Sequence, residues 1–442
     1  MNRDSIPGNP YSEAICFLYS LRWFGAKFGL ENTFKLAALA GNPERNLKFI
    51  HVAGTNGKGS TCAILESIYR AAGLRVGLFT SPHLVSFRER IQINRELISP
   101  ADVVRLVNRT KSFLTKFSDA DHPTFFEAVT ILALQYFAEQ KCDLVIWETG
   151  LGGRLDATNI VTPLASVITN VQYDHQKWLG ETLSSIAAEK AGIIKSRIPV
   201  VTGVEEPEAF EVISKIAAER SAPLTRVSRL PENVFSNFPL SGNHQRKNAE
   251  LALTTIDVLQ NRIPVSANAI RTGLSNVNWP GRLQLVWMPD GKRVLLDGAH
   301  NIAGAKVLAD ALNANFPNFP ESRRTIILGI LRDKDWRGIC EIIAPLAGRI
   351  FTVPVQNERT ATARELAEVC REIHPGAEIQ FCETLGEALE QTRDDSFLVI
   401  TGSLYLVGEA MEMLGISPVV APDERALNEW GAANQNQNLP AG

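Results

Sequence analysis

The sequence predicts an α/β protein in which mostly parallel sheets are covered by helices. Short apolar runs alternate with longer amphipathic segments along almost the whole chain, which is the pattern of such sheets. Helical patterns of twelve or more residues, such as TFFEAVTILALQYFAEQ at 124–140, lie between several of these runs. A chain of 442 residues is also too long for one ordinary hydrophobic core, so we expect two packed domains.

Nine apolar runs are the expected strands. In chain order they are 47–54, 75–81, 143–150, 164–171, 198–203, 293–299, 324–331, 349–355 and 396–403. A Pro-Gly turn and a Pro-Asp-Gly turn punctuate the chain before the last four runs, which places a linker near 280–292. We therefore expect domains at 1–285 and 286–421, the second a smaller Rossmann-like α/β domain. Residues 422–442 are small and polar, and we expect them to form a mobile tail.

Composition excludes several classes of protein. Hydrophobic residues at 45% and charged residues at 21% are typical of a soluble globular protein. A net charge of −3 provides no electrostatic footprint for nucleic acid or an anionic membrane, and no apolar run approaches the ~18 residues that span a bilayer. The six cysteines are scattered without metal-ligand spacing, which predicts buried free thiols. We expect a cytoplasmic monomer with neither nucleic acid nor membrane as partner.

The segment HVAGTNGKGS at 51–60 has the pattern of a phosphate-binding loop. A strand ends in a turn that contains Gly54, Gly57 and Gly59, and a helix follows. Glycines allow successive backbone N–H groups to point into one concavity, and the helix N-terminus adds partial positive charge. Lys58 can then reach the terminal phosphates. A plain Gly-rich turn with an exposed lysine is the alternative, but strand, loop and helix in this order favour phosphate binding.

The loop departs from the spacing G-x-x-x-x-G-K-[ST]. Ala53 stands where the first glycine would be, and Gly59 separates Lys58 from Ser60. Ordinary signalling GTPases and motor ATPases are therefore less expected. The helix is expected to start at about Ser60, and Ser60 or Thr61 can offer a hydroxyl to magnesium.

Carboxylates follow two of the expected strands, which is where open α/β sheets place ligand groups. Glu148 ends the run at 143–150, and the glycines of the following LGGRLDATN allow close backbone approach near Asp156. Asp174 and His175 follow the run at 164–171. A lone histidine is more often structural, and Mg²⁺ prefers oxygen ligands, so the residues alone leave open whether His175 joins Glu148 on a metal.

Further polar residues have weaker signals. Lys190 lies in an Ala-rich helical pattern and, from the residues alone, is best interpreted as a surface lysine. Asp297 and His300 follow the expected strand at 293–299, and Arg332, Asp333, Lys334 and Asp335 follow the one at 324–331. Because these clusters lie at the carboxyl ends of strands, an active site in the crevice between two domains is the most economical arrangement.

Ten segments together resemble the folylpolyglutamate synthase/dihydrofolate synthase family of the Mur ligase group. The matching strings are GTNGKGS, SPHLVSFRERI, TFFEAVT, ETGLGGRLDATN, YDHQKWLG, EKAGIIK, GNHQRKNA, PGRL, DGAHN and GILRDKD. They occur in family order over roughly residues 49 to 336. One departure is Ile302, where the family usually has proline after DGAHN, which affects only the rigidity of that turn.

The resemblance implies a site assembled from both domains. It implies ATP binding by Gly54, Thr55, Asn56, Gly57, Lys58, Gly59, Ser60, Asn248, Arg282 and Asp297. It implies magnesium ligands Ser81, Glu148 and His175, and a pterin site at Thr124, Phe125, Phe126, Glu127, Leu155, Asp156 and Ala157. An aromatic pair beside a carboxylate suits a flat heterocycle, although plain helix core is the alternative for one of the two phenylalanines. Lys190 matches a lysine that is carbamylated in the family and helps to hold a second magnesium, and Lys58, Lys190 and His300 are the implied catalytic residues.

The implied reaction joins L-glutamate to dihydropteroate and to tetrahydrofolate polyglutamates with ATP and Mg²⁺. A carboxylate has no leaving group at neutral pH, so amide formation needs phosphoryl transfer to give an acyl phosphate. Three alternatives remain: a folylpolyglutamate synthase without the first activity, a muramyl-peptide synthetase, or a nucleotide-dependent switch. Only about fifty residues precede Gly54, which leaves little room for a nucleotide-sugar domain, and TNVQYDH is not a guanine-reading N-K-x-D motif.

Overall fold

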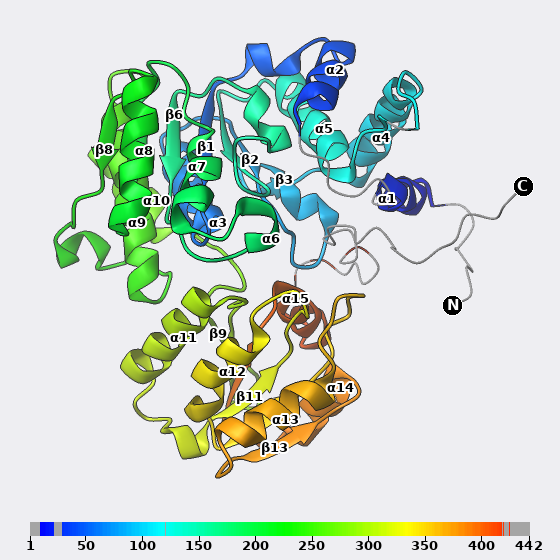
Figure 1. Ribbon diagram of the computed structural model, residues 1–442, viewed down its shortest axis with the longest axis vertical. Helices are drawn as coiled ribbons and strands as arrows, with labels where there is room; N and C mark the ends of the chain where they lie inside the picture. The colour runs from blue at the N-terminus through cyan, green and yellow to red at the C-terminus, as the bar shows by residue number, and fades with distance from the viewer. Residues whose placement is uncertain (1–8, 22–28, 120, 418, 420–423, 425–442) are drawn as a thin grey trace, which may run out of the picture.

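The computed structural model describes residues 9–21, 29–119, 121–417, 419 and 424, and it contains two mostly parallel sheets (Figure 1). The first has eight strands in the order β4-β3-β2-β5-β1-β6-β7-β8, of which β3 and β4 form an antiparallel edge. The strands are β1 (Phe49–Ala53), β2 (Val76–Phe79), β3 (Ile91–Ile93), β4 (Glu96–Leu97), β5 (Leu144–Glu148), β6 (Ala165–Ile168), β7 (Val200–Thr202) and β8 (Leu224–Arg226).

Helices cover both faces of the first sheet. Phe49 packs on one face with α1 (Pro10–Ser20), α2 (Glu31–Leu39), α4 (Pro100–Leu114) and α5 (Phe125–Glu139). Ile50 points to the other face, against α3 (Lys58–Ala71), α9 (Asn243–Leu259) and α10 (Ala267–Ser275). The short α6 (Gln176–Leu179) is followed by α7 (Leu183–Ala191) and α8 (Pro207–Glu219), which pack near β6 and β7. The central strands are therefore buried on both sides, and this is why they appear as continuous apolar runs.

The second sheet has six strands in the order β13-β12-β11-β14-β10-β9, with only β9 antiparallel. Its strands are β9 (Gln284–Trp287), β10 (Arg293–Leu296), β11 (Thr325–Leu328), β12 (Arg349–Thr352), β13 (Glu378–Phe381) and β14 (Phe397–Thr401). One face is covered by α11 (Ile302–Asn315), α12 (Trp336–Ile343) and α13 (Ala363–Ile373), and the other by α14 (Leu385–Gln391) and α15 (Leu404–Met413).

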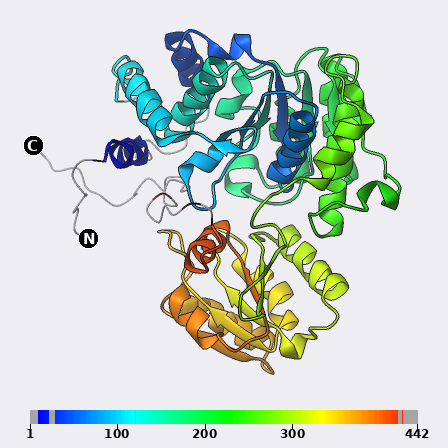
Figure 2. The same ribbon diagram turned by 180° about the vertical axis from the view of Figure 1, so that it is seen from behind.

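The helix α15 lies at the junction of the two parts of the molecule, as both views show (Figure 1 and Figure 2). Its Gly408 packs so closely against the first part that an added Cβ would lie 2.0 Å from the carbonyl oxygen of Leu84. Only a residue without a side chain fits there, so the junction is a close backbone contact.

The predicted fold class is confirmed, and all nine predicted runs contain strands. The prediction missed β3, β4, β8, β9 and β13. Of these, β4, β8, β9 and β13 are short and partly exposed, so their sequences lack a continuous apolar run. The range 280–292, where we expected a linker, contains β9, which pairs antiparallel with β10. The linker and the domain division stay predictions; β9 begins at Gln284, next to the predicted boundary.

Smaller expectations also differ from the structure. α3 begins at Lys58 and not at Ser60, and Cys16 is exposed whereas the other five cysteines are buried free thiols. The predicted tail at 422–442 lies outside the described residues except for Glu424, which is buried, and its mobility stays a prediction. No helix within the described ranges combines the length and the apolar character needed to cross a bilayer.

Candidate active site

The phosphate-type loop follows β1 at the carboxyl edge of the first sheet. Gly57 caps α3 with a φ of 81°, and a Cβ there would lie 2.4 Å from Asn248 Oδ1. A Cβ on Gly54 would lie 1.8 Å from Thr169 Oγ1. Both positions therefore exclude any other residue, by backbone conformation and by contact. The loop runs in a narrow space between the ends of β1 and β6 and the helix α9.

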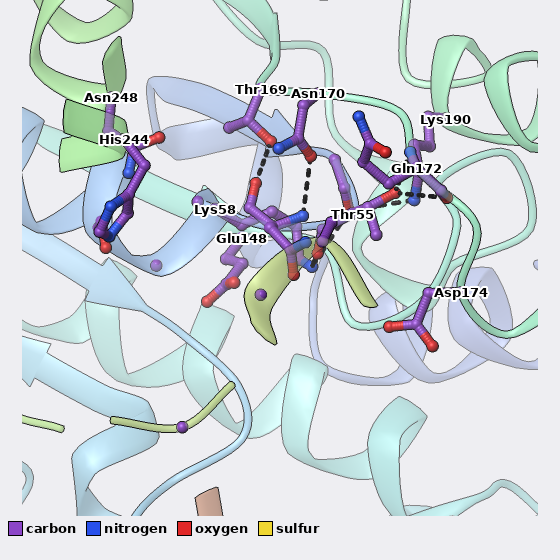
Figure 3. A pocket seen from close by; sticks show the side chains of 18 of the residues that line it. Thr55, Lys58, Glu148, Thr169, Asn170, Gln172, Asp174, Lys190, His244 and Asn248 are labelled. Atoms are coloured by element: carbon purple, nitrogen blue, oxygen red, sulfur yellow. Dashed lines mark hydrogen bonds between the residues drawn. The ribbon is translucent and has the colours of Figure 1, made fainter. Parts of the chain in front are cut away.

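The end of β6 holds the loop in place. Asn170 accepts the N–H of Asn56 at 2.8 Å through Oδ1, and the Thr169 hydroxyl donates to the Asn56 carbonyl at 2.6 Å. The Thr55 hydroxyl donates to the Gln172 carbonyl at 3.2 Å. Figure 3 shows these bonds as dashed lines, with Asn248 on one side of the loop and Lys190 on the other.

Two lysines from different elements meet at the loop. Lys58 Nζ donates to the carbonyls of Gly54 and Thr55 at 3.1 and 3.2 Å. Lys190 Nζ donates to the same Gly54 carbonyl at 3.0 Å. The positive charge of both side chains is thereby directed at the concavity that the glycine loop encloses.

Lys190 is buried, which corrects its interpretation as a surface lysine. Its residue is 2% exposed, and burial, helped by the charge of Lys58, lowers its pKa to about 7. Gly153 makes this possible, because a Cβ there would lie 2.9 Å from the carbonyl oxygens of both Glu189 and Lys190. The backbone of the loop after β5 thus packs directly on α7 and covers the lysine.

Glu148 ends β5 next to the loop. The residue is 3% exposed, and its Oε2 accepts the N–H of Ser81 at 3.0 Å. Burial raises the pKa of Glu148 to about 7, although the positive charge of Lys58 acts in the opposite direction. The carboxylate and the Ser81 hydroxyl are hard oxygen donors beside a phosphate-type loop, and this donor set fits Mg²⁺. Within the described part of the chain, no three His, Cys, Asp or Glu side chains gather as a metal cluster.

His175 has contacts of its own. Its backbone is left-handed, with a φ of 52°, and its Nε2 lies 3.3 Å from Lys334 Nζ. Burial and the neighbouring Lys334 lower its pKa to about 3, so the imidazole is uncharged at neutral pH. An uncharged imidazole can serve as a metal ligand. In this structure, however, it faces an ammonium group, and its predicted metal role stays a prediction.

The predicted pterin residues form another wall of the cavity. Thr124 caps α5, and Glu127 Oε2 accepts the N–H and the hydroxyl of Thr124 at 2.7 and 2.9 Å. Asp156 accepts the N–H groups of Leu151 and Thr158 at 2.8 and 3.0 Å. Both carboxylates therefore hold backbone in place, in addition to any contact with a substrate.

The phenylalanines at the start of α5 differ in their surroundings. Phe125 is buried, and the Arg90 guanidinium lies 5.4 Å from the centre of its ring. Phe126 lies over Gly150, where an added Cβ would be 2.6 Å from the ring. Both pack against the core beneath α5, and both line the cavity.

The second part of the molecule presents the turn after β10. Asp297 accepts the N–H groups of Leu283 and Ala299 at 2.8 and 3.0 Å. Burial raises the pKa of Asp297, although the positive charge of Arg282 acts in the opposite direction. His300 Nδ1 lies 2.7 Å from the Gly298 carbonyl, and burial lowers its pKa to about 4. The neutral ring thus carries its proton on Nδ1, and Nε2 is left as an acceptor.

Polar contacts join the two parts directly at the loop. Lys334 Nζ donates to Asp174 Oδ1 at 2.6 Å, with both side chains under 10% exposed. Asn301 Nδ2 donates to Asp174 Oδ2 at 3.0 Å and to Asn56 Oδ1 at 3.1 Å. The ammonium of Lys334 holds the pKa of Asp174 well below its usual range, although burial alone would raise it. This network connects the phosphate-type loop to the second sheet.

One cavity of about 1180 Å³ is lined by every predicted site residue. The structure brings together the loop, Ser81, Glu148, His175, Lys190, Asn248, Arg282, Asp297, His300, the 124–127 segment and the 155–157 segment. Their individual roles stay predictions. In the predicted cluster at 332–335 only Lys334 lines the cavity; Arg332 pairs with Glu365, and Asp335 caps α12.

Sequence reasoning gave no role to several residues of the cavity. Arg90, Arg359, Ser403 and Tyr405 line it, and Asn301 joins the two parts. Arg90 lies inside SPHLVSFRERI, one of the segments that resemble the family, and this position was the available signal for it. The others follow strands or begin helices in the second part, where no local pattern points to the first part.

Comparisons with known proteins agree on one family. The description "Mur ligase middle domain" matches residues 52–233, and "Mur ligase, glutamate ligase domain" matches residues 281–404. The chain is 36% identical to the dihydrofolate synthase/folylpolyglutamate synthase of Bacillus subtilis strain 168, over 91% of this chain and 99% of that protein. The crystal structure of folylpolyglutamate synthase from Thermotoga maritima is 36% identical, with a TM-score of 0.80 over 92% of this chain and 96% of that one. An Escherichia coli structure in complex with DHPP and ADP is 32% identical, with a TM-score of 0.79 over 92% and 98% of the two chains.

The ion pair between Lys334 and Asp174 predicts a measurable opening of the molecule. In Lys334→Met a buried carboxylate loses its cation, which typically destabilises by roughly 3–5 kcal/mol. We expect the two parts to separate, and small-angle X-ray scattering to show a larger radius of gyration than for the unchanged protein.

The matched control is Arg332→Met on the same loop. Its partner Glu365 lies in the same part of the molecule, and the two side chains are 59% and 45% exposed. This variant should scatter like the unchanged protein. If Lys334→Met also did so, the ion pair would not hold the two parts together.

Proposed function

The chain belongs to the dihydrofolate synthase/folylpolyglutamate synthase enzymes of the Mur ligase family, and we propose from this premise that it adds L-glutamate to dihydropteroate and to tetrahydrofolate polyglutamates. As an enzyme of this family it is an ATP-dependent ligase. The names of its relatives support both activities, and nothing favours the narrower alternative of a folylpolyglutamate synthase alone.

The observation that carries the proposal is the single cavity between the two sheets. A phosphate-type loop with Lys58 forms one wall, an aromatic wall begins at Phe125, and Asp297 and His300 come from the opposite side. ATP, a pterin carboxylate and an amino acid must meet for this reaction, and each wall suits one of these chemistries. A nucleotide switch would have no use for the aromatic wall.

We assign ATP to the loop and to the residues around Asn248, Arg282 and Asp297. The polyphosphate would lie against the backbone N–H groups at the start of α3. Lys58 would leave the Gly54 and Thr55 carbonyls to contact the terminal phosphate. An ADP complex is described for the Escherichia coli relative, which supports this assignment.

Ser81 and Glu148 would hold Mg²⁺, with His175 as the third predicted ligand. When bound, Mg²⁺ supplies neutralisation of the charge on the β- and γ-phosphate oxygens. The buried Glu148 carboxylate would gain a counter-charge from the ion, in an environment where burial disfavours its ionised form.

The chain's own groups would act mainly by position and charge. The carboxylate of the pterin substrate attacks the γ-phosphorus of ATP, the bond to the β-phosphate oxygen breaks, and ADP leaves. Lys58 and the loop N–H groups would stabilise the charge on the transferred group. The amine of glutamate then attacks the acyl phosphate, and inorganic phosphate departs. Neither step needs a covalent nucleophile from the enzyme.

His300 and the interdomain contacts would serve the second step. Nε2 of the uncharged imidazole can accept a hydrogen bond from the attacking amine, because Nδ1 holds the ring proton toward Gly298. The contacts of Asp174 with Lys334 and Asn301 close the cavity beside the loop. Closure excludes water, which would otherwise hydrolyse the acyl phosphate.

We assign a carbamylated side chain to Lys190. The unprotonated amine is the form that reacts with carbon dioxide, and the pKa of about 7 makes it abundant at neutral pH. The resulting anion would sit beside Lys58, where it would replace the repulsion between two lysine side chains by an attraction. It could then help to hold a second Mg²⁺.

The proposed function is tested by the dependence of ADP release on substrates. We expect ADP only when L-glutamate is present together with dihydropteroate or tetrahydrofolate. Lys58→Ala should lower the rate by at least about 100-fold while thermal melting stays unchanged, because the lysine acts on developing charge and not on packing.

The control for this substitution is Lys215→Ala, at an exposed position on α8. It should release ADP at the native rate. Activity with tetrahydrofolate alone would restrict the enzyme to the narrower alternative. ADP release that needs neither pterin, or a Lys58→Ala variant of near-native rate, would contradict the proposal.

The assignment of Lys190 predicts a carbamate that can be observed directly. Protein equilibrated with ¹³C-bicarbonate should show a carbamate carbon by NMR, and Lys190→Ala should lose both that signal and turnover. Short carboxylates such as acetate should restore part of the turnover, since they replace the missing anion.

Lys195→Ala is the matched control, because Lys195 is a partly buried lysine that donates to the Asn159 carbonyl and does not line the cavity. The Lys195→Ala variant should keep the carbamate signal of Lys190. Absence of a carbamate carbon in the unchanged protein would refute the assignment.

A further inference from the structure

Glu424 is anchored on the first part of the molecule, although it follows α15 of the second part in the chain. The residue is 7% exposed. Its Oε2 accepts the N–H of Phe87 at 2.6 Å and the hydroxyl of Ser86 at 2.9 Å. Ser86 is the N-cap of the 3-10 turn η3 (Phe87–Arg90), so the carboxylate lies where the first N–H groups of the turn need an acceptor.

A chain of hydrogen bonds leads from Glu424 to the cavity. The carbonyl oxygen of Glu424 lies 2.9 Å from His83 Nε2, and His83 Nδ1 lies 2.9 Å from Arg90 Nε. Arginine is only a donor, so Nδ1 must be the acceptor. The proton of the neutral His83 ring is therefore on Nε2, where it donates to Glu424. Glu424 thus fixes the tautomer of His83, and His83 orients the guanidinium of Arg90.

Arg90 lies where a substrate can reach it. Its residue is 3% exposed and lines the cavity, with the guanidinium over the Phe125 ring. Burial lowers its pKa to about 10, which still leaves it a cation at neutral pH. The phenol of Tyr405 lies in the same region and contacts Arg359 NH2 at 3.5 Å. A desolvated guanidinium beside an aromatic wall suits a carboxylate.

The segment between His83 and Arg90 also packs against α15. A Cβ added to Gly408 of α15 would lie 2.0 Å from the carbonyl oxygen of Leu84. Glu89 accepts the N–H groups of Leu84, Val85 and Ser86 at 2.7 to 2.9 Å. The loop is therefore held by its own glutamate, by α15 and by Glu424, and its orientation of Arg90 depends on all three.

We propose that Glu424, through His83, positions Arg90 to bind a carboxylate group of a substrate in the cavity. Arg90 is the substrate-binding residue, and His83 and Glu424 are positioning residues. The identity of the carboxylate rests on the proposed function, because both the pterin substrate and L-glutamate carry one. The Michaelis constants for dihydropteroate and for L-glutamate distinguish which of the two carboxylates Arg90 binds.

The first experiment compares Michaelis constants in five variants. Arg90→Lys, His83→Phe and Glu424→Ala should raise the KM for one carboxylate substrate by about tenfold or more, with the KM for ATP unchanged. A rise for dihydropteroate assigns Arg90 to the pterin substrate, and a rise for L-glutamate assigns it to the amino acid. Glu424→Gln retains an acceptor oxygen and should stay near native, and Glu390→Ala, at an exposed carboxylate on α14, is the unrelated control.

The second experiment does not need turnover. With ¹⁵N-labelled histidine, the His83 ring should show a protonated Nε2 and an unprotonated Nδ1 in the unchanged protein. Glu424→Ala should produce a mixture of tautomers, because the carbonyl acceptor leaves with the anchor. If the unchanged protein showed no turnover, the proposed function would be refuted. The protonation of the His83 ring nitrogens would still test whether Glu424 positions His83. Unchanged tautomers in Glu424→Ala, or an unchanged KM for both carboxylates in Arg90→Lys, would overturn the inference.

Discussion

The side-chain nitrogens of Lys58, which is partly buried, and Lys190, which is buried, donate to one carbonyl oxygen, that of Gly54, and the rest of the site depends on this contact. A positive charge on both side chains at so short a separation is unfavourable unless anions surround them. The structure supplies two anions, since Glu148 ends β5 and Asp174 follows β6, the strands on either side of β1. Burial, however, disfavours the ionised form of Glu148, and Asp174 is already paired with Lys334. In the proposed function, the polyphosphate of ATP and a carbamate on Lys190 supply the missing negative charge.

The topology explains why these groups can meet. β1 lies between β5 and β6, so Gly54, Glu148 and Asn170 all follow strands that end at one edge of the sheet. The second sheet turns the end of β10 toward the same place, with His300 beside Asp174. Contacts between Asn56 and Asn301 then cross directly from the phosphate-type loop to the second part. The lining of the cavity and the association of the two parts consequently share residues, among them Asn56 and Asp174.

Sequence reasoning succeeded where a local pattern has one physical cause. Central strands are buried on both faces and therefore appear as apolar runs, and Gly57 is required by a backbone conformation that other residues avoid. It failed where the cause lies far away in the chain. The local sequence around Lys190 is typical of a surface helix, and only the packing of the Gly153 backbone on α7 buries the lysine. The partly exposed edge strand β8 was missed because it has no apolar run. The family resemblance singled out Lys190, which lines the cavity, although its predicted role stays a prediction. The resemblance could not indicate that Glu424 contacts the first part.

The central claim is that one cavity activates a carboxylate by phosphoryl transfer before an amine attacks it. The most direct measurement uses dihydropteroate labelled with ¹⁸O in its carboxylate, together with ATP and L-glutamate. If an acyl phosphate forms, one labelled oxygen must depart with the phosphate, and mass spectrometry of the inorganic phosphate should show one ¹⁸O for each amide formed. Amide formation with unlabelled phosphate would contradict the account.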